Sequence, residues 1–350
     1  MLVIHAVNIH NGGGSVLLKA LVSSCHPEAP TLLLVDERLK VDDFSSANIV
    51  IKYIKPTIFS RFFAECLLYK KTMSNDVVIC FGNLPPLFKL KAVTYVFVQN
   101  RLLLENANLS YFPIFVRLRL LFEKFWLHIR RGNAHKFIVQ SDSMKKLLSA
   151  QLGSDRDVKV IPFTALKNPK QAKNAKNKYD FIYVASFDAH KNHKALTDAW
   201  AVLSTQGLYP SLVLTLDDKS YQILTNYIKN TYQDLRLNIF NLGILSNEEL
   251  LVGYQCSRAL IYPSLTESFG LPLIEASHYG LEILASELDF VRDLVDPVQT
   301  FDPKSPMSIA RAVRRFLGKK ESRKDILSAE QFLNSLLNYI DEDANKNGIS

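Results

Sequence analysis

Two carboxylates that lie eight residues apart, Glu267 and Glu275, are the side chains of this 350-residue sequence best placed to do chemistry. Glu267 lies in a loop with Gly270 and Pro272, and Glu275 lies in the first turns of a helix expected to begin at Leu271. Two carboxylates can act as a general acid and a general base, or each can accept hydrogen bonds from hydroxyl groups. The spacing alone leaves both chemistries open.

The residues around these carboxylates predict a strand, a loop and a helix in that order. The apolar run 259–262 predicts the strand, which Pro263 and Ser264 end, and residues 271–279 predict the helix. The first N–H groups of a helix have no partner within the helix, and they point at a site that favours negative charge. The corner therefore predicts a phosphate site beside the two carboxylates.

The composition is that of an ordinary globular protein with room for two domains. Lys plus Arg number 42 against 34 for Asp plus Glu, so the net charge is +8. This basic excess suits a phosphorylated small molecule, a nucleic acid or an anionic membrane surface, and it is equally compatible with no polyanionic partner. Four widely spaced cysteines without a CxxC pair favour neither a disulfide framework nor a zinc site, and they suit a reducing cytoplasm.

The order of expected elements predicts an α/β fold. Residues 2–9 predict a strand, the sequence Asn11-Gly12-Gly13-Gly14-Ser15 a turn, and residues 16–23 a helix. The glycines allow backbone N–H groups to approach an anion, although they also suit a simple tight turn, and the pattern is not GxGxxG. Strand and helix candidates alternate in both halves of the chain, which predicts two doubly wound, mainly parallel sheets.

A change of composition divides the two halves. Residues 166–178 are rich in Lys and Asn and have few large apolar residues, so we expect a linker there. The predicted domains are 1–165 and 179–321, followed by a C-terminal helix and polar tail over 322–350 that we expect to pack back on the N-terminal domain.

The segment 111–131 mixes aromatic, leucine and arginine residues at helical spacing. Its apolar residues include Phe122, Phe125 and Trp126, and its bases include Arg117 and Arg119. Two interpretations fit this pattern: a core helix with a solvated basic side, or a helix that lies on an anionic membrane surface. No run of about 18 apolar residues is present, so no transmembrane helix is expected.

Several of these segments resemble a known family. Residues 262–275, YPSLTESFGLPLIE, look like the E-x7-E segment of the family-4 retaining glycosyltransferases, which have the GT-B fold of two Rossmann-like domains facing a central cleft. Residues 280–286, 180–195 and 241–243 are similar to neighbouring parts of the same domain. The turn 99–101 and the loop 190–193 look most like the enzymes that build bacterial surface polysaccharides.

The resemblance implies a role for each matching residue. Lys191 would neutralise charge on a leaving diphosphate, and Glu267 would hold the donor sugar; these two are the catalytic candidates. Glu275 would accept hydrogen bonds from the ribose hydroxyls. The expected donor-binding residues are Gly12, Gly13, Gly14, Ser186, Lys191, Gly243, Ser268, Phe269, Gly270, Leu271 and Glu275.

Two positions depart from the family pattern. Ser186 stands where the family usually carries an Arg, so Lys191 acts alone or shares its role with Lys194, His190 or His193. Gln99 stands where a His is frequent. Gln99, Asn100 and Arg101 are the expected acceptor-side residues.

The resemblance implies an enzyme that moves a sugar from a nucleotide diphosphate-sugar to a hydroxyl of a glycan or lipid-linked acceptor, in the synthesis of lipopolysaccharide O-antigen, capsule or exopolysaccharide. No metal is expected, because the protein's own charge would neutralise the leaving diphosphate. No cofactor is expected, because the nucleotide-sugar is a substrate, and no nucleic acid is expected as a partner. A nucleotide-sugar epimerase of the same fold and a catalytically silent sugar-nucleotide-binding subunit remain as alternatives. The expected location is the cytoplasm, and under the second interpretation of 111–131 the protein is peripheral on the inner face of the membrane.

Overall fold

A computed structural model of the chain describes residues 1–25, 30–39, 48–105, 113–153, 157–165, 178–233, 235–319 and 328–329. The chain divides into two compact units, Met1–Ala312 and Val313–Ser350. Both sheets belong to the first unit, and the division falls within helix α10 (Pro306–Phe316). The predicted linker lies outside the described residues apart from Lys178, and so does the predicted C-terminal segment apart from 328–329. The predicted domain limits therefore stay a prediction.

The N-terminal half of the first unit is built on a seven-stranded parallel sheet with the order β3-β2-β1-β4-β5-β6-β7. Its strands are β1 (Leu2–Ala6), β2 (Thr31–Asp36), β3 (Ile49–Ile54), β4 (Val77–Cys80), β5 (Val93–Phe97), β6 (Lys136–Val139) and β7 (Val158–Val160). Every residue of β2 is buried, as expected of a strand covered on both faces.

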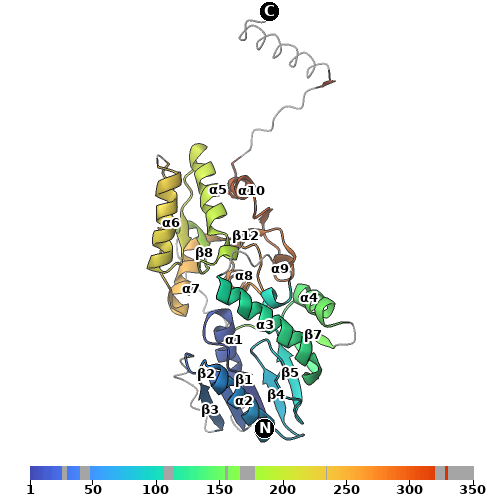
Figure 1. The fold of residues 1–350 in the computed structure, drawn as a ribbon. Helices are drawn as coiled ribbons and strands as arrows, with labels where there is room; N and C mark the ends of the chain where they lie inside the picture. The colour runs from blue at the N-terminus through green and yellow to red at the C-terminus, as the bar shows by residue number, and fades with distance from the viewer. Residues whose placement is uncertain are drawn as a thin grey trace, which may run out of the picture. The chain divides into compact units, whose positions relative to one another are not determined.

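Four α-helices belong to the described part of this half (Figure 1). They are α1 (Gly12–Ser23), α2 (Ile58–Lys71), α3 (Ile114–Arg130) and α4 (Asp142–Leu152), with short 3₁₀ helices η1 (Arg101–Leu103) and η3 (Arg131–Asn133). Ser141 caps α4 by accepting a hydrogen bond from the Met144 N–H.

The C-terminal half is built on a six-stranded parallel sheet with the order β10-β9-β8-β11-β12-β13. Its strands are β8 (Tyr179–Tyr183), β9 (Leu212–Leu214), β10 (Ile239–Asn241), β11 (Ser257–Tyr262), β12 (Glu282–Ser286) and β13 (Gln299–Phe301). The helices are α5 (His193–Thr205), α6 (Asp218–Thr231), α7 (Asn247–Gln255), α8 (Leu271–His278), α9 (Asp289–Arg292) and α10, with the 3₁₀ helix η4 (Ala189–Lys191). A capping box between Ser246 and Glu249 begins α7.

Both sheets reverse their strand order at a central strand. β1 pairs with β2 on one side and β4 on the other, and β8 pairs in the same way with β9 and β11. In open parallel sheets the crevice beyond the carboxyl ends of the strands at such a reversal is where ligands bind. The topology confirms the predicted pair of doubly wound parallel sheets and points to the loops after β1, β8 and β11.

Candidate active site

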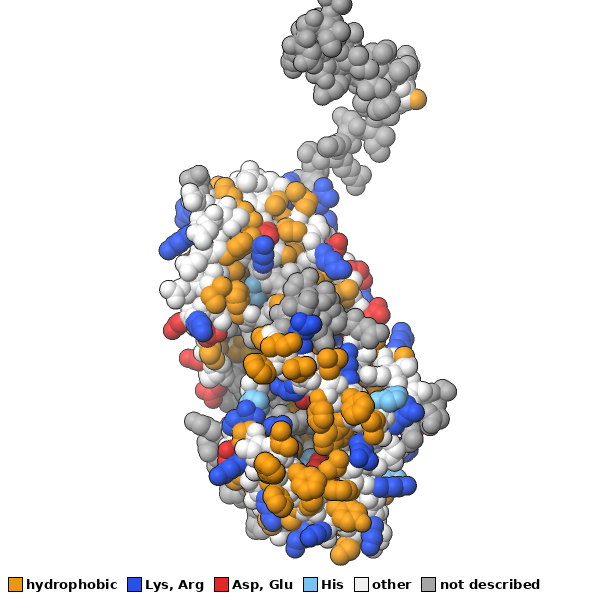
Figure 2. All heavy atoms as spheres, in the orientation of Figure 1, with side chains coloured by type: hydrophobic (Ala, Val, Ile, Leu, Met, Phe, Trp, Pro, Cys, Tyr) orange, Lys and Arg blue, Asp and Glu red, His pale blue; other side chains and the backbone are white. Residues whose placement is uncertain are grey.

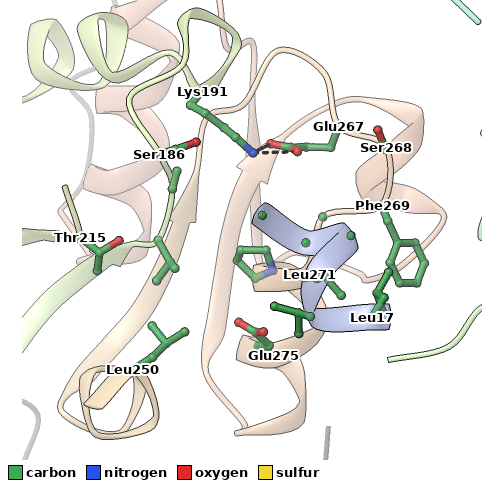
Figure 3. Close-up of a pocket in the computed structure, with 18 of the residues that line it drawn as sticks. Leu17, Ser186, Lys191, Thr215, Leu250, Glu267, Ser268, Phe269, Leu271 and Glu275 are labelled. Carbon is green, nitrogen blue, oxygen red and sulfur yellow. Dashed lines mark hydrogen bonds and ion pairs between the residues drawn. The ribbon is translucent and has the colours of Figure 1, made fainter. Parts of the chain in front are cut away.

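A pocket of about 590 Å³ lies where the loops after strands of both sheets come together (Figure 3). Loops that follow β1, β5, β6, β8, β9 and β11 all contribute to its walls. The predicted site residues among the lining are Gly12, Gly13, Gly14, Gln99, Ser186, Lys191, Glu267, Ser268, Phe269, Gly270, Leu271 and Glu275. The two halves therefore share one site.

An ion pair between Lys191 and Glu267 spans the upper part of the pocket in Figure 3. The Lys191 ammonium donates to both carboxylate oxygens of Glu267, at 2.7 and 2.9 Å. The two side chains are only 16% and 9% exposed, so water screens the pair weakly. Because both oxygens of Glu267 accept hydrogen bonds from a cation, the carboxylate is a poor nucleophile and a well-anchored binding group.

The backbone around Lys191 is held from two sides. Lys191 ends η4, and the next residue, Asn192, has the left-handed φ of 62° that starts α5. The Asn192 amide donates to the carbonyls of Pro263 and Pro303 at 3.1 and 2.7 Å, and the buried Tyr183 hydroxyl donates to the Lys191 carbonyl at 2.6 Å. The loop is thus tied to the end of β11, from which Glu267 also comes.

The other basic candidates do not supply charge to the pocket. Burial lowers the pKa of His193 to about 4, and its ring packs against Tyr183 and Phe187. Burial also lowers the pKa of His190. The Lys194 ammonium lies over the ring of Tyr227, 5.1 Å from its centroid. Lys191 is the only cationic side chain among the lining residues that the structure describes, so this geometry favours the alternative in which Lys191 acts alone.

Two helix N-termini meet at the pocket. The N-cap of α8 is Gly270, with a φ of +73° and no side chain to cap the helix, and the N-cap of α1, Asn11, makes no side-chain cap either. The glycines that were predicted to form a turn before the helix instead form the first turn of α1. A Cβ built on Gly13 would lie 3.2 Å from Leu271 Cδ1, so this glycine turn packs directly against the start of α8. Uncapped N–H groups and two positive dipole ends together favour an anion of more than one charge.

Glu275 lies below the ion pair in Figure 3, one turn into α8. The Tyr254 hydroxyl of α7 donates to its Oε2 at 2.8 Å. Burial raises the pKa of Glu275, and the hydrogen bond from Tyr254 partly opposes that shift. A carboxylate held in this way by one oxygen can offer the other to hydroxyl groups of a ligand.

Gln99 reaches the pocket from the end of β5. Its amide nitrogen donates to the Phe81 carbonyl at 2.8 Å, and its Oε1 lies 3.4 Å from the position of a Cβ built on Gly14. Its side chain therefore presents an acceptor to the glycine turn. Its backbone N–H donates to Oδ1 of Asn83, whose φ is +71°.

Three predicted site residues lie outside the pocket lining. Asn100 uses its side-chain oxygen to cap η1, and Arg101 forms an ion pair with Glu105. Gly243 has the left-handed φ of 78°, and the residues that follow it, Ile244 and Leu245, line the pocket in its place. The expectation that Asn100 and Arg101 contact a ligand has no support in this geometry.

The sequence analysis did not predict some of the residues that line the pocket. Thr215, Leu216 and Asp217 follow β9, and Gln140 follows β6. Leu250 comes from α7 and lies with Thr215 on the side of the pocket away from Leu271 in Figure 3. The position of Gln140 and Thr215 just beyond the ends of strands was the signal that could have found them. Among the described residues, no group of three or more His, Cys, Asp or Glu side chains could hold a metal ion.

Sequence comparisons match this chain to glycosyltransferases. Residues 165–331 match the family described as glycosyl transferases group 1. Two relatives are the serotype-specific mannosyltransferase WbdA of Escherichia coli, 28% identical over 187 residues, and the O-antigen chain mannosyltransferase B of the same organism, 26% identical over 155 residues. These matches cover 52% and 42% of this chain, but only 23% and 39% of the relatives, so the chain spans about a quarter of WbdA.

Solved structures share the architecture across both halves. Sucrose-phosphate synthase from Thermosynechococcus elongatus superposes with a TM-score of 0.66 at 15% identity, over 91% of this chain and 89% of that one. The lipopolysaccharide outer core galactosyltransferase WaaB gives 0.58 at 16% identity, over 97% and 99%. At such identities the likeness shows the fold. The chain therefore has the GT-B fold, and its residues 165–331 are similar to the glycosyl transferases group 1.

Proposed function

We propose that this protein is a retaining glycosyltransferase that moves a hexose from a nucleotide diphosphate-sugar to a hydroxyl of a growing glycan. One observation carries the proposal: two uncapped helix N-termini, Lys191, Glu267 and Glu275 converge on a single pocket between the two halves. A diphosphate with a ribose on one side and a sugar on the other matches this order of groups.

Each group has a part in the proposed reaction. The N–H groups at Gly12–Gly14 and Phe269–Leu271 hold the diphosphate, and Glu275 accepts hydrogen bonds from the ribose. Lys191 stabilises the negative charge that grows on the leaving diphosphate, and Glu267 fixes both Lys191 and the hydroxyls of the sugar. This arrangement supplies positive charge from the protein, which is the basis for proposing transfer that needs no metal.

Retention requires the new bond to form on the face that the leaving group vacates. The bond from the anomeric carbon to the diphosphate oxygen breaks, the acceptor oxygen bonds to the same carbon on the same face, and the acceptor proton passes to the departing diphosphate. The Lys191 pair leaves Glu267 unsuited to attack the sugar, which supports this front-face route over a covalent intermediate.

The substrate class follows from the relatives, as an extension to this chain. WbdA and the O-antigen chain mannosyltransferase B are mannosyltransferases, and HepE from Anabaena, a structural neighbour with a TM-score of 0.62, was solved with UDP and glucose. We therefore propose family-4 membership, a hexose donor and an acceptor of lipopolysaccharide O-antigen, capsule or exopolysaccharide type, lipid-linked at the cytoplasmic face of a membrane. These relatives are transferases and do not favour an epimerase or a silent binding subunit.

The test has two stages. A thermal-shift panel of UDP-, GDP-, dTDP- and ADP-hexoses identifies the donor, because a ligand that binds the folded state raises the unfolding temperature. The selected donor is then incubated with glycan acceptors in the presence of EDTA, and the anomeric configuration of the product is read by NMR. A product with retained configuration is expected. Inversion, isomerised donor without transfer, or donor binding without any turnover contradicts the proposal.

A further inference from the structure

Helices α2 and α3 carry a large set of apolar side chains on the molecular surface. Ile58, Phe59 and Phe115 are 85%, 78% and 82% exposed. We define the aromatic face as these three residues together with Phe62, Phe63, Ile114, Leu118, Leu121, Phe122, Phe125 and Ile129, all of them exposed. In Figure 2 orange side chains gather over the part of the molecule where Figure 1 places α2 and α3. Monomeric proteins rarely leave so many large apolar side chains together in water.

The aromatic face is one rigid surface. The loop Pro85–Phe88 lies between the two helices: the Phe88 ring packs edge-on against Phe62, and the Trp126 indole donates to the Pro85 carbonyl at 2.9 Å. Beneath the surface, Leu68 of α2 and Leu120 and Leu127 of α3 are buried in the same hydrophobic core. The helices therefore do not need to move to present their outer sides together.

Basic side chains accompany this face, and acidic ones do not. α2 carries Arg61, Lys70 and Lys71, and α3 carries Arg117, Arg119, Lys124 and Arg130. Each helix has a single acidic residue, and neither is free. Glu65 is buried and accepts from the Leu87 N–H, and Glu123 lies beside Arg119. An apolar surface with basic surroundings is the pattern of elements that lie in the plane of an anionic bilayer.

We propose that the aromatic face binds the surface of an anionic lipid bilayer, with the aromatic rings in the acyl boundary and the basic residues at the headgroups. A second copy of the chain fits this face less well, because the basic residues of the two copies would face and repel each other across the interface. Within the described ranges no helix combines the length and apolar character that crossing a bilayer requires. The inference stands apart from the proposed function, since it needs neither donor nor acceptor.

The test is cosedimentation of the full chain with phosphatidylcholine vesicles, with and without phosphatidylglycerol. We expect binding to the anionic vesicles and little to the neutral ones. Ile58→Ser combined with Phe115→Ser lowers the partition coefficient about 10- to 100-fold, because each exposed apolar side chain contributes through burial. The matched control is Ile223→Ser, an exposed isoleucine of α6 on the C-terminal half, which leaves binding unchanged.

The charged part of the surface is tested separately. Lys70→Gln, Lys71→Gln and Arg117→Gln together weaken binding to anionic vesicles by about 100-fold at low salt, at roughly a tenfold loss or less per basic residue. All variants must unfold at the wild-type temperature, which the exposure of these side chains leads us to expect. Failure of the wild-type chain to bind anionic vesicles at low salt overturns the proposal. So does a wild-type dimer, seen by light scattering, that the Ile58/Phe115 variant converts to a monomer.

Discussion

The backbone N–H of Arg101 donates to Ser268 Oγ at 2.9 Å, which joins the end of β5 to the loop that carries Glu267. On the other side of Glu267, the Thr266 hydroxyl donates to Glu105 Oε2 at 3.2 Å. Both neighbours of Glu267 are therefore bonded to one short segment of the N-terminal half. The position of a donor-side carboxylate depends on residues that lie in the opposite half.

Glu105 is expected to act as a positioning residue through this contact. Its Oε2 also accepts from Arg101 Nε at 3.1 Å, so Glu105→Ala frees Arg101 and Thr266 together. We expect kcat to fall about tenfold, because a small displacement of a reacting geometry is costly, while KM for the donor changes little. Glu105→Gln keeps an acceptor for Thr266 and restores part of the rate. The control is Glu287→Ala, which removes a carboxylate that pairs with Arg292 elsewhere. An equal fall of kcat in this control would contradict the positioning role of Glu105.

Lys191→Met removes the cation from the pocket. We expect kcat to drop about 100- to 1,000-fold, since one preorganised electrostatic group contributes on that scale. The control is Lys194→Met, three residues further on, whose ammonium lies over Tyr227 and away from the lining. The measurement is the steady-state kcat of both variants. Similar kcat values for the two would show that Lys191 has no catalytic role.

Glu275→Gln is expected to raise the stability of the fold and to weaken donor binding. Burial raises the pKa of Glu275 in the folded state, so between its unfolded and folded pKa the folded state binds more protons than the unfolded one. The free energy of unfolding then falls as pH rises through that window, and the ionised carboxylate costs stability at pH 7. The Gln variant should unfold at a higher temperature than the wild type at pH 7, and the difference should vanish below about pH 4, where the unfolded carboxyl is also protonated.

The same variant should bind the donor about tenfold more weakly, because an amide has one acceptor oxygen where the carboxylate has two. Calorimetric titration with the donor measures the loss. Wild-type donor affinity should itself decline as pH falls through the raised pKa of Glu275. A variant that binds the donor like the wild type would place the ribose elsewhere.

Tyr254→Phe tests the support of Glu275. The hydroxyl that donates to Glu275 Oε2 lowers the pKa of that carboxyl, so its loss raises the pKa further. We expect donor affinity to fall several-fold at pH 7, by about the free energy of one charge-assisted hydrogen bond, and to recover in part at higher pH. Tyr279→Phe, whose ring lies 5.9 Å from that of Tyr254, serves as the control. A pH-independent loss would mean that Tyr254 supports the fold alone.

Much of the fold could be predicted because its signals are local. The strand at 259–262 and the helix at 271–279 were predicted from residues within a few positions of one another, and the structure confirms both. The parallel strand order then brings the loops after β1, β8 and β11 together without further information.

The parts that could not be predicted depend on contacts between distant segments. Lys191 and Glu267 are 76 positions apart, and no periodicity reveals that they pair. Helical spacing showed that α3 is amphipathic, but only the packing of Leu120 and Leu127 shows which side faces the core and how much apolar surface stays outside. Burial lowers the pKa of His193 to about 4, whereas the sequence left open whether this side chain shares the role of Lys191.

The separate origins of the pocket walls have a consequence for protein engineering. Thr215 to Asp217 follow β9, and Ile244 to Leu250 follow β10 and enter α7. Lys191 and Glu267 come instead from the loops after β8 and β11, and Asn192 ties the first of these loops to the carbonyls of Pro263, after β11, and Pro303, after β13. Libraries that vary the first set leave the second set and its supports intact. The choice of donor could therefore be redesigned at the part of the pocket wall between β9 and α7. The positive charge of Lys191, which stabilises the leaving group, would stay in place.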